Sequence, residues 1–145
     1  MKPAITIKRR LCRSLAAIAL FAVLFTLTAC TIGPNGASWK TVSGSSESTF
    51  DGGFTFSAKS ANGTLNRTFE LTEEDLASIY VTSSCSKGGM FLTVSQDGNE
   101  DGTEIKQYIT KHDNPLAADT LKPGDIRFSI RFEEASDCTV TIRWR

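Results

Sequence analysis

The sequence is poor in the residue arrangements that perform catalysis. It has one histidine, His112, and no Gly-x-Ser-x-Gly elbow, His-Glu-x-x-His helix or phosphate-binding glycine loop. Asp113 follows His112 directly, and adjacent residues seldom orient each other for base catalysis, so a surface loop histidine is expected. The consecutive acids Glu73, Glu74 and Asp75 are typical of a solvated turn. The sequence therefore predicts a protein that is not an enzyme and needs no cofactor.

The chain also lacks an apolar run long enough to cross a membrane. Its longest such run, Leu15 to Leu27, has thirteen residues, whereas a spanning helix needs about 20. A basic segment, residues 1–14, precedes it, and this order is that of a signal peptide. Arg9-Arg10 raises the twin-arginine export route, but Cys12 and Arg13 stand where that motif needs apolar residues. The general secretory route is therefore favoured.

The apolar run ends in Leu27-Thr28-Ala29-Cys30, which resembles the lipobox of bacterial lipoproteins. This resemblance implies cleavage after Ala29 and a diacylglyceryl group on the Cys30 sulfur, with two or more acyl chains giving firm membrane anchoring. Thr31 is not the aspartate associated with inner-membrane retention, which leans towards the outer membrane if the cell has one. The alternative is an ordinary secretory signal with an incidental cysteine. We expect a lipid-anchored protein on the extracytoplasmic face of a cell membrane or outer membrane.

Beyond the leader, basic side chains are few. Five of the 16 basic residues precede Cys30, which leaves 11 against all 16 acidic ones, a net charge of −5. A mildly acidic domain disfavours nucleic acid as a partner and disfavours binding to membranes through surface charge. Cysteines are also scarce. Apart from Cys12 and Cys30 only Cys85 and Cys138 remain, and in an exported protein we expect them to form a disulfide that contributes about 4 kcal/mol.

Two regions follow Cys30. Residues 30–49 are rich in serine and glycine, which predicts a flexible tether, with Trp39 either docked on the domain or at the bilayer interface. Residues 50–145 alternate apolar and polar side chains between turn signals such as Asn62-Gly63. This pattern predicts an all-β fold, a single antiparallel β-sandwich of about seven strands, with Thr72 capping at most one helical turn. The residues expected to face inwards include Phe54, Phe56, Val81, Met90, Leu92, Val94, Ile105, Gln107, Ile109, Phe128, Ile130, Phe132, Val140, Ile142 and Trp144.

Residues 50–145 resemble a group of small bacterial lipoproteins with a C-terminal β-sandwich of uncharacterised function. The matching pieces are the serine-rich Ser43–Ser48, the Lys87-Gly88 hairpin, Lys122-Pro123-Gly124 before a closing strand, and the aromatic-ended Ile142-Arg143-Trp144. The resemblance implies the fold, and it implies no catalytic residues.

Binding is the function that this pattern favours. If the inward residues are correct, Tyr80, Phe91 and Tyr108 face outwards, where they either bind an envelope or extracellular protein or a glycan, or are covered by the tether, the long loop 111–121 or the other sheet. The alternatives are a structural or accessory subunit of an envelope complex, and an inhibitor of extracellular hydrolases that uses the loop 97–103 or 111–121. A weak calcium-loop candidate comprises Asp97, Asn99 and Asp101, but position twelve is Tyr108 where a carboxylate is needed. No other metal ligands are expected.

The anchor can be tested at Cys30. Because a serine cannot accept the lipid through a thioether, Cys30→Ser should move the protein out of the membrane fraction when cells are fractionated. Unchanged membrane association of the variant would contradict the lipobox interpretation.

Overall fold

The computed structural model describes residues 35–96 and 104–145. The lipobox and the calcium-loop candidate lie outside these residues. The strands are β1 (Ala37–Ser43), β2 (Ser46–Phe50), β3 (Gly53–Leu71), β4 (Tyr80–Ser84), β5 (Lys87–Gln96), β6 (Glu104–Tyr108), β7 (Lys111–Pro115) and β8 (Gly124–Arg143), and a short helix, α2 (Glu73–Ala77), follows β3. In the described residues no helix is long and apolar enough to cross a membrane.

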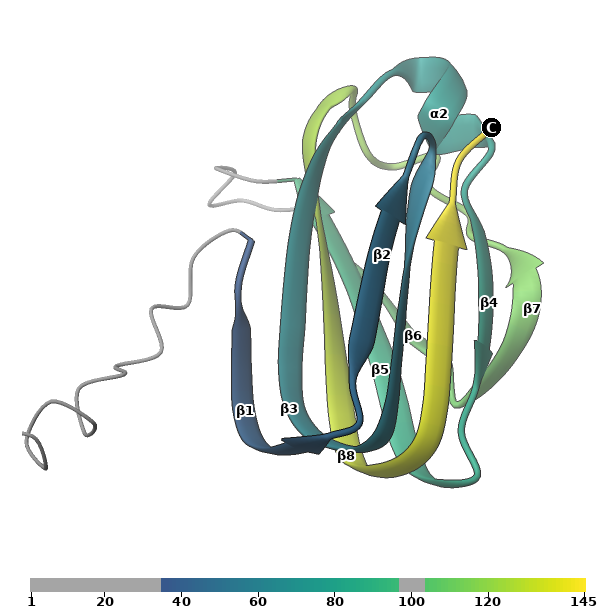
Figure 1. Cartoon of the computed structure of the whole chain (residues 1–145). Coiled ribbons are helices and arrows are strands. Elements are labelled where there is room, and N and C mark those ends of the chain that lie inside the picture. The colour runs from purple at the N-terminus through teal and green to yellow at the C-terminus, as the bar shows by residue number, and fades with distance from the viewer. Residues whose placement is uncertain (1–34, 97–103) are drawn as a thin grey trace, which may run out of the picture. The chain divides into compact units, whose positions relative to one another are not determined.

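The eight strands of the described part form one antiparallel sheet that is folded double. β3 and β8 pair along their whole lengths, and both bend sharply near their middles (Figure 1). One layer holds β2, residues 53–58 of β3, residues 138–143 of β8, β4 and β7. The other layer holds β1, residues 60–71 of β3, residues 124–136 of β8, β5 and β6. We call these layers one and two. The predicted all-β sandwich is confirmed.

Within the described residues, five segments of the chain pass from one layer to the other at the same end of the sandwich, which we call the corner. They are β3, β8 and the consecutive pairs β1–β2, β4–β5 and β6–β7. Backbones in the left-handed region gather at this corner, including Gly44, Gly63 and the non-glycine residues Glu134 and Asp137. Residues in this conformation let the chain change direction sharply, which regular strand geometry does not allow.

The core lies between the layers and is rich in aromatic rings. Phe54 and Phe69, from the two halves of β3, stack with ring centroids 5.5 Å apart, and Phe128 stacks on Trp144 at 5.8 Å. The inward residues expected on β4, β5 and β8 are buried as predicted. Ile109 is also buried, whereas Ile105 and Gln107 on β6 are only half-buried.

Several sequence expectations need correction. The segment expected to be the second half of the tether forms β1 and β2, whose serines and threonines suit an exposed edge. Trp39 is docked on the domain, stacked on Phe56 at 5.5 Å. Asn62-Gly63 does not close a hairpin but lies at the bulge where β3 bends, since the same residues suit both structures. Likewise, residues 126–144, which were expected to form a closing hairpin, belong mostly to the single bent strand β8. Lys87-Gly88, which was expected to form a hairpin turn, begins β5.

Cys85 and Cys138 are free thiols in the structure. The register that pairs Ser84 with Thr139 brings Cys85 opposite Cys138 when it is continued by one residue. The Cys138 thiol contacts the Ala58 carbonyl at 3.5 Å, and burial, followed by the nearby Cys85, raises its pKa. The disulfide stays a prediction, and the register makes it compatible with the fold.

The far end of the sandwich from the corner is closed by α2 and the C-terminal residue. Thr72 caps α2 as predicted: its hydroxyl accepts the Asp75 N–H at 3.2 Å, and its own N–H donates to the Asp75 carboxylate at 3.0 Å. Arg145 Nε donates to Asp75 Oδ1 at 3.0 Å. The Thr72 N–H is the main reason that the pKa of Asp75 is lowered, with the Thr72 hydroxyl and Arg145 also lowering it against the effect of burial.

The Asp75 carboxylate should therefore stabilise the fold in a pH-dependent way. Asp75→Asn should lower the free energy of unfolding by about 1 kcal/mol near neutral pH, since it weakens the cap. A carboxyl with a lowered pKa stabilises above its unfolded-state value and loses this effect as the pH falls through its folded-state value. The gap between wild type and variant, measured by urea unfolding, should therefore shrink below the ordinary pKa of 3.8.

The control is Asp51→Asn. Asp51 also lies near Arg145, at 3.7 Å, but its side chain is 95% exposed, so its loss should change stability by less than about 0.5 kcal/mol. Equal effects of the two substitutions, or a gap independent of pH, would contradict the role of Asp75.

Candidate binding trough

The outer face of layer two carries a row of side chains from five different strands. Tyr108 on β6 pairs with Phe91 on β5, and Phe91 pairs with Arg131 on β8. The row continues through Thr64 on β3 to Ser38 on β1. Because inner and outer residues alternate along each strand, the burial of Met90, Leu92, Ile130 and Leu65 turns the members of this row outwards.

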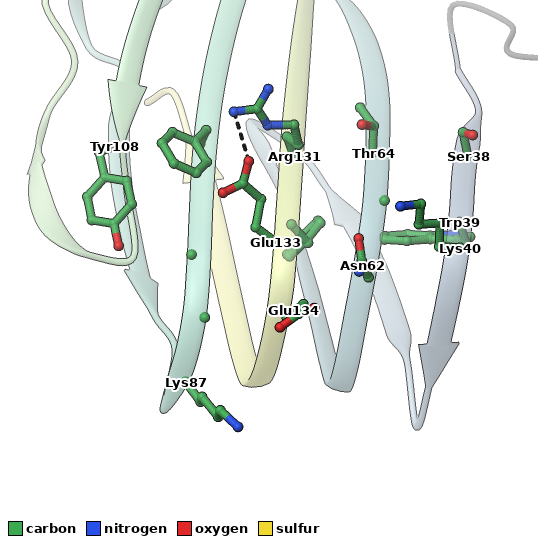
Figure 2. Close-up of a pocket in the computed structure, with 15 residues that line it drawn as sticks. Ser38, Trp39, Lys40, Asn62, Thr64, Lys87, Tyr108, Arg131, Glu133 and Glu134 are labelled. Atoms are coloured by element: carbon green, nitrogen blue, oxygen red, sulfur yellow. Dashed lines mark ion pairs between the residues drawn. The ribbon is translucent and has the colours of Figure 1, made fainter.

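An aromatic pair and a guanidinium occupy one half of the row. The rings of Phe91 and Tyr108 meet edge to face with centroids 4.9 Å apart, and the Arg131 guanidinium lies 4.8 Å above the Phe91 ring. Arg131 Nη2 forms an ion pair with Glu133 Oε1 at 3.0 Å (Figure 2). Tyr108 is 57% exposed although it lies beside Phe91. The exposed Tyr108 ring and the Arg131 guanidinium thus lie on either side of Phe91.

Below this row, towards the corner, the outer face is hollowed. The depression has a volume of about 790 Å³ and adjoins a second one of about 560 Å³, which shares Thr64, Phe91, Tyr108 and Arg131 with it. Three glycines line the first depression: Gly63, Gly88 and Gly89. We call the two depressions together the trough. Their combined lining gives a surface that is broad and shallow rather than an enclosed cavity.

Gly88 and Gly89 differ in how strictly the structure requires a glycine. Gly88 has φ +83°, and a Cβ there would lie 2.4 Å from the carbonyl oxygens of Glu133 and Glu134, so the backbone requires glycine. Gly89 has no such restriction. A Cβ on Gly89 would meet the rings of Phe91 and Tyr108 at 3.4 and 3.5 Å, which is ordinary contact. Gly89 is itself buried, and the two rings lie against the position that its side chain would take.

Trp39 and Phe132 line the first depression and Leu92 lines the second, and apart from the glycines polar and charged groups form the rest of the trough. Ser38 and Lys40 line it from β1, Asn62 and Thr64 from β3, and Lys87 from the start of β5 (Figure 2). Beneath the second depression the outer face is held by a hydrogen bond of 2.7 Å from Ser129 Oγ to the buried Asn66 Oδ1. The trough thus offers hydroxyl, amide, ammonium, guanidinium and carboxylate groups around one exposed aromatic ring.

Tyr80 does not belong to this surface. It lies on β4 in layer one, where Arg143 stacks over its ring at 4.8 Å and its hydroxyl donates to the Asp113 carbonyl at 3.2 Å. Burial and the nearby Asp113 raise the pKa of Tyr80. Of the three aromatics expected to form one surface, the structure brings Phe91 and Tyr108 together and separates Tyr80 from them.

Sequence reasoning missed Arg131, Gly89 and the β1 residues of the trough. Alternation alone identified Arg131 as outward, but its neighbour Phe91 lies forty residues away and pairing between β5 and β8 was not expected.

The segment 111–121 begins with β7, so His112 lies in a strand and not in a loop, with its Nε2 3.5 Å from Gln107 Nε2. Within residues 35–96 and 104–145, no group of three His, Cys, Asp or Glu side chains could hold a metal ion.

No protein-family model matches the chain, and no curated protein matches it in sequence. Among solved structures, a module described as "CBM4 structure and function" aligns with a TM-score of 0.33 and 13% identity, over 81% of this chain and 88% of its own. TmCBM61, solved in complex with β-1,4-galactotriose, aligns with a TM-score of 0.31 and 18% identity, over 63% of this chain and 66% of its own. Likenesses this remote carry no argument about function, and the sandwich rests on the strand pairing described above.

Proposed function

We propose that this protein is a non-catalytic binding module of the cell envelope, and that its trough binds a glycan chain. The observation that carries the proposal is the exposed ring of Tyr108, supported by Phe91 and surrounded by hydrogen-bonding groups over a hollowed face. A sugar ring has an apolar face that can stack on an aromatic side chain and hydroxyl groups that need hydrogen-bonding partners. The trough supplies both within one row of the sheet.

The composition of the trough favours a glycan over a protein partner. The centre of a protein–protein interface is typically depleted in charge and rich in apolar side chains. Here one exposed ring, that of Tyr108, and the half-buried rings of Phe91 and Trp39 are surrounded by charged and hydroxyl side chains. The other large exposed apolar residues of the described part, Val42 and Phe50, lie on β1 and β2 and do not line the trough. No contiguous apolar patch therefore marks a protein-binding surface there.

The proposal includes lipid attachment at Cys30, which rests on the lipobox. The attached lipid would hold the domain close to the membrane, because the part of the chain described in the structure begins soon after Cys30. Asn35 already accepts a hydrogen bond from the Thr68 N–H at 2.7 Å, and Gly36 accepts one from Arg67 at 3.3 Å. Five residue steps join Cys30 to Asn35, which span at most about 18 Å. The glycan would accordingly be one present at the surface of the membrane that holds the lipid.

The proposal predicts that binding depends on the trough. In binding assays with an array of envelope and extracellular oligosaccharides, Tyr108→Ala should weaken binding about tenfold or more, because the stacked ring is lost. Gly89→Leu should have a comparable effect, since its larger side chain would displace the rings of Phe91 and Tyr108, which lie 3.4 and 3.5 Å from a Cβ at this position, while its backbone φ is an ordinary one.

The matched control is Tyr80→Ala, which removes the other outward tyrosine from layer one. It should leave glycan binding unchanged. If no oligosaccharide binds, or if Tyr80→Ala and Tyr108→Ala act alike while both variants remain folded by circular dichroism, the trough is not a glycan site.

A further inference from the structure

The charges of the trough differ in sign from those of the domain around it. Lys40, Lys87 and Arg131 line the first depression against Glu133 and Glu134, an excess of one positive charge. The chain from Cys30 on has 11 basic and 16 acidic residues, so its remainder has eight basic against 14 acidic. Lys106 lines the second depression and pairs with Glu104 at 2.7 Å. An anionic ligand that the acidic remainder of the domain repels is therefore attracted at the trough.

Arg131 is held as a preorganised anion-binding group in the centre of the row. Its guanidinium lies over Phe91 and is oriented by Glu133, although its side chain is 60% exposed. A guanidinium has five N–H donors in a planar fork, and the contact with Glu133 involves Nη2. The fork therefore retains donors that can bind a carboxylate in a bidentate manner.

We propose that the glycan bound in the trough is acidic, and that Arg131 binds a carboxylate on one of its sugar units. This inference rests on the proposed function and names the chemical class of its ligand. Tyr108 stacks against one sugar ring, Arg131 binds the carboxylate of another unit, and Lys40 and Lys87 at the two sides of the trough add long-range attraction.

The spacing of the strands sets a minimum length for this ligand. Two strand-to-strand steps separate Tyr108 from Arg131 along the row, about 10 Å at 4.8 Å per step. The whole row from β6 to β1 spans four steps, about 19 Å. A single sugar ring contacts fewer groups of this row than a chain of rings does, so a uronic acid monosaccharide should bind more weakly than an oligomer of the same sugar.

The test compares uronic acid oligosaccharides with the methyl esters of the same oligosaccharides, since esterification removes the charge and keeps the sugar backbone. The probes are tetramers and monomers of galacturonate, glucuronate and mannuronate, titrated calorimetrically into the purified full chain. At least one acidic tetramer should bind about tenfold or more tightly than its ester, and added salt should weaken the acid more than the ester. Arg131→Gln should remove the preference, and Arg131→Lys should restore part of it.

The matched control is Arg143→Gln, because Arg143 lies over Tyr80 at the same 4.8 Å on the outer face of layer one. It should leave the acid preference intact. Equal affinity for acid and ester, or loss of the preference in Arg143→Gln, would overturn the acidic-ligand inference while the proposed function stands. Binding of an acidic peptide in place of every oligosaccharide, or of anionic lipid vesicles alone, would overturn both.

Discussion

The stacking of Phe54 on Phe69 is the contact on which the architecture depends. Both rings belong to β3, and they can meet at 5.5 Å only because that strand doubles back on itself. β8 bends beside β3 and brings Phe128 against Trp144 in the same way. Neither layer could bury its inner face alone, since each is a single sheet with one apolar side. Folding the continuous sheet double lets its inner face cover itself.

The corner that makes this possible also shapes the trough. Where strands bend, bulges and left-handed backbones interrupt the regular display of side chains, and glycine is favoured. Gly63 and Gly88 occupy such positions, and with Gly89 they leave the outer face of layer two without side chains next to an exposed tyrosine. The hollow is therefore a consequence of how the sheet bends. Its chemistry is supplied by side chains such as Arg131 and Lys40, which the bend does not dictate.

Much of this fold can be predicted from the sequence where the information is local. The alternation of Met90, Leu92 and Val94, and of Phe128, Ile130 and Phe132, identified their buried faces, and Thr72 identified the helix cap. The path of the chain through the bends was not predictable in this way, because Asn62-Gly63 suits a hairpin turn and a bulge equally. β1 and β2 were missed since exposed edge strands rich in serine resemble a linker.

The candidate site shows the same limit. Phe91 and Tyr108 were recognised as outward, but nothing local indicates that Arg131 pairs with Phe91 or that Tyr80 lies on the other layer. These relations depend on the register between β5 and β8 and between β4 and β8, which is set by packing over long sequence separations. A site assembled from five strands by register becomes visible only once the strands are paired.

The most direct measurement of the central claim is NMR mapping of amide chemical shifts while the protein is titrated with the oligosaccharide that binds it most tightly. The largest changes should fall on β5, on β6 and on residues 124–136 of β8, around Phe91, Tyr108 and Arg131. Changes confined to β2, β4 and β7 would contradict the proposed site.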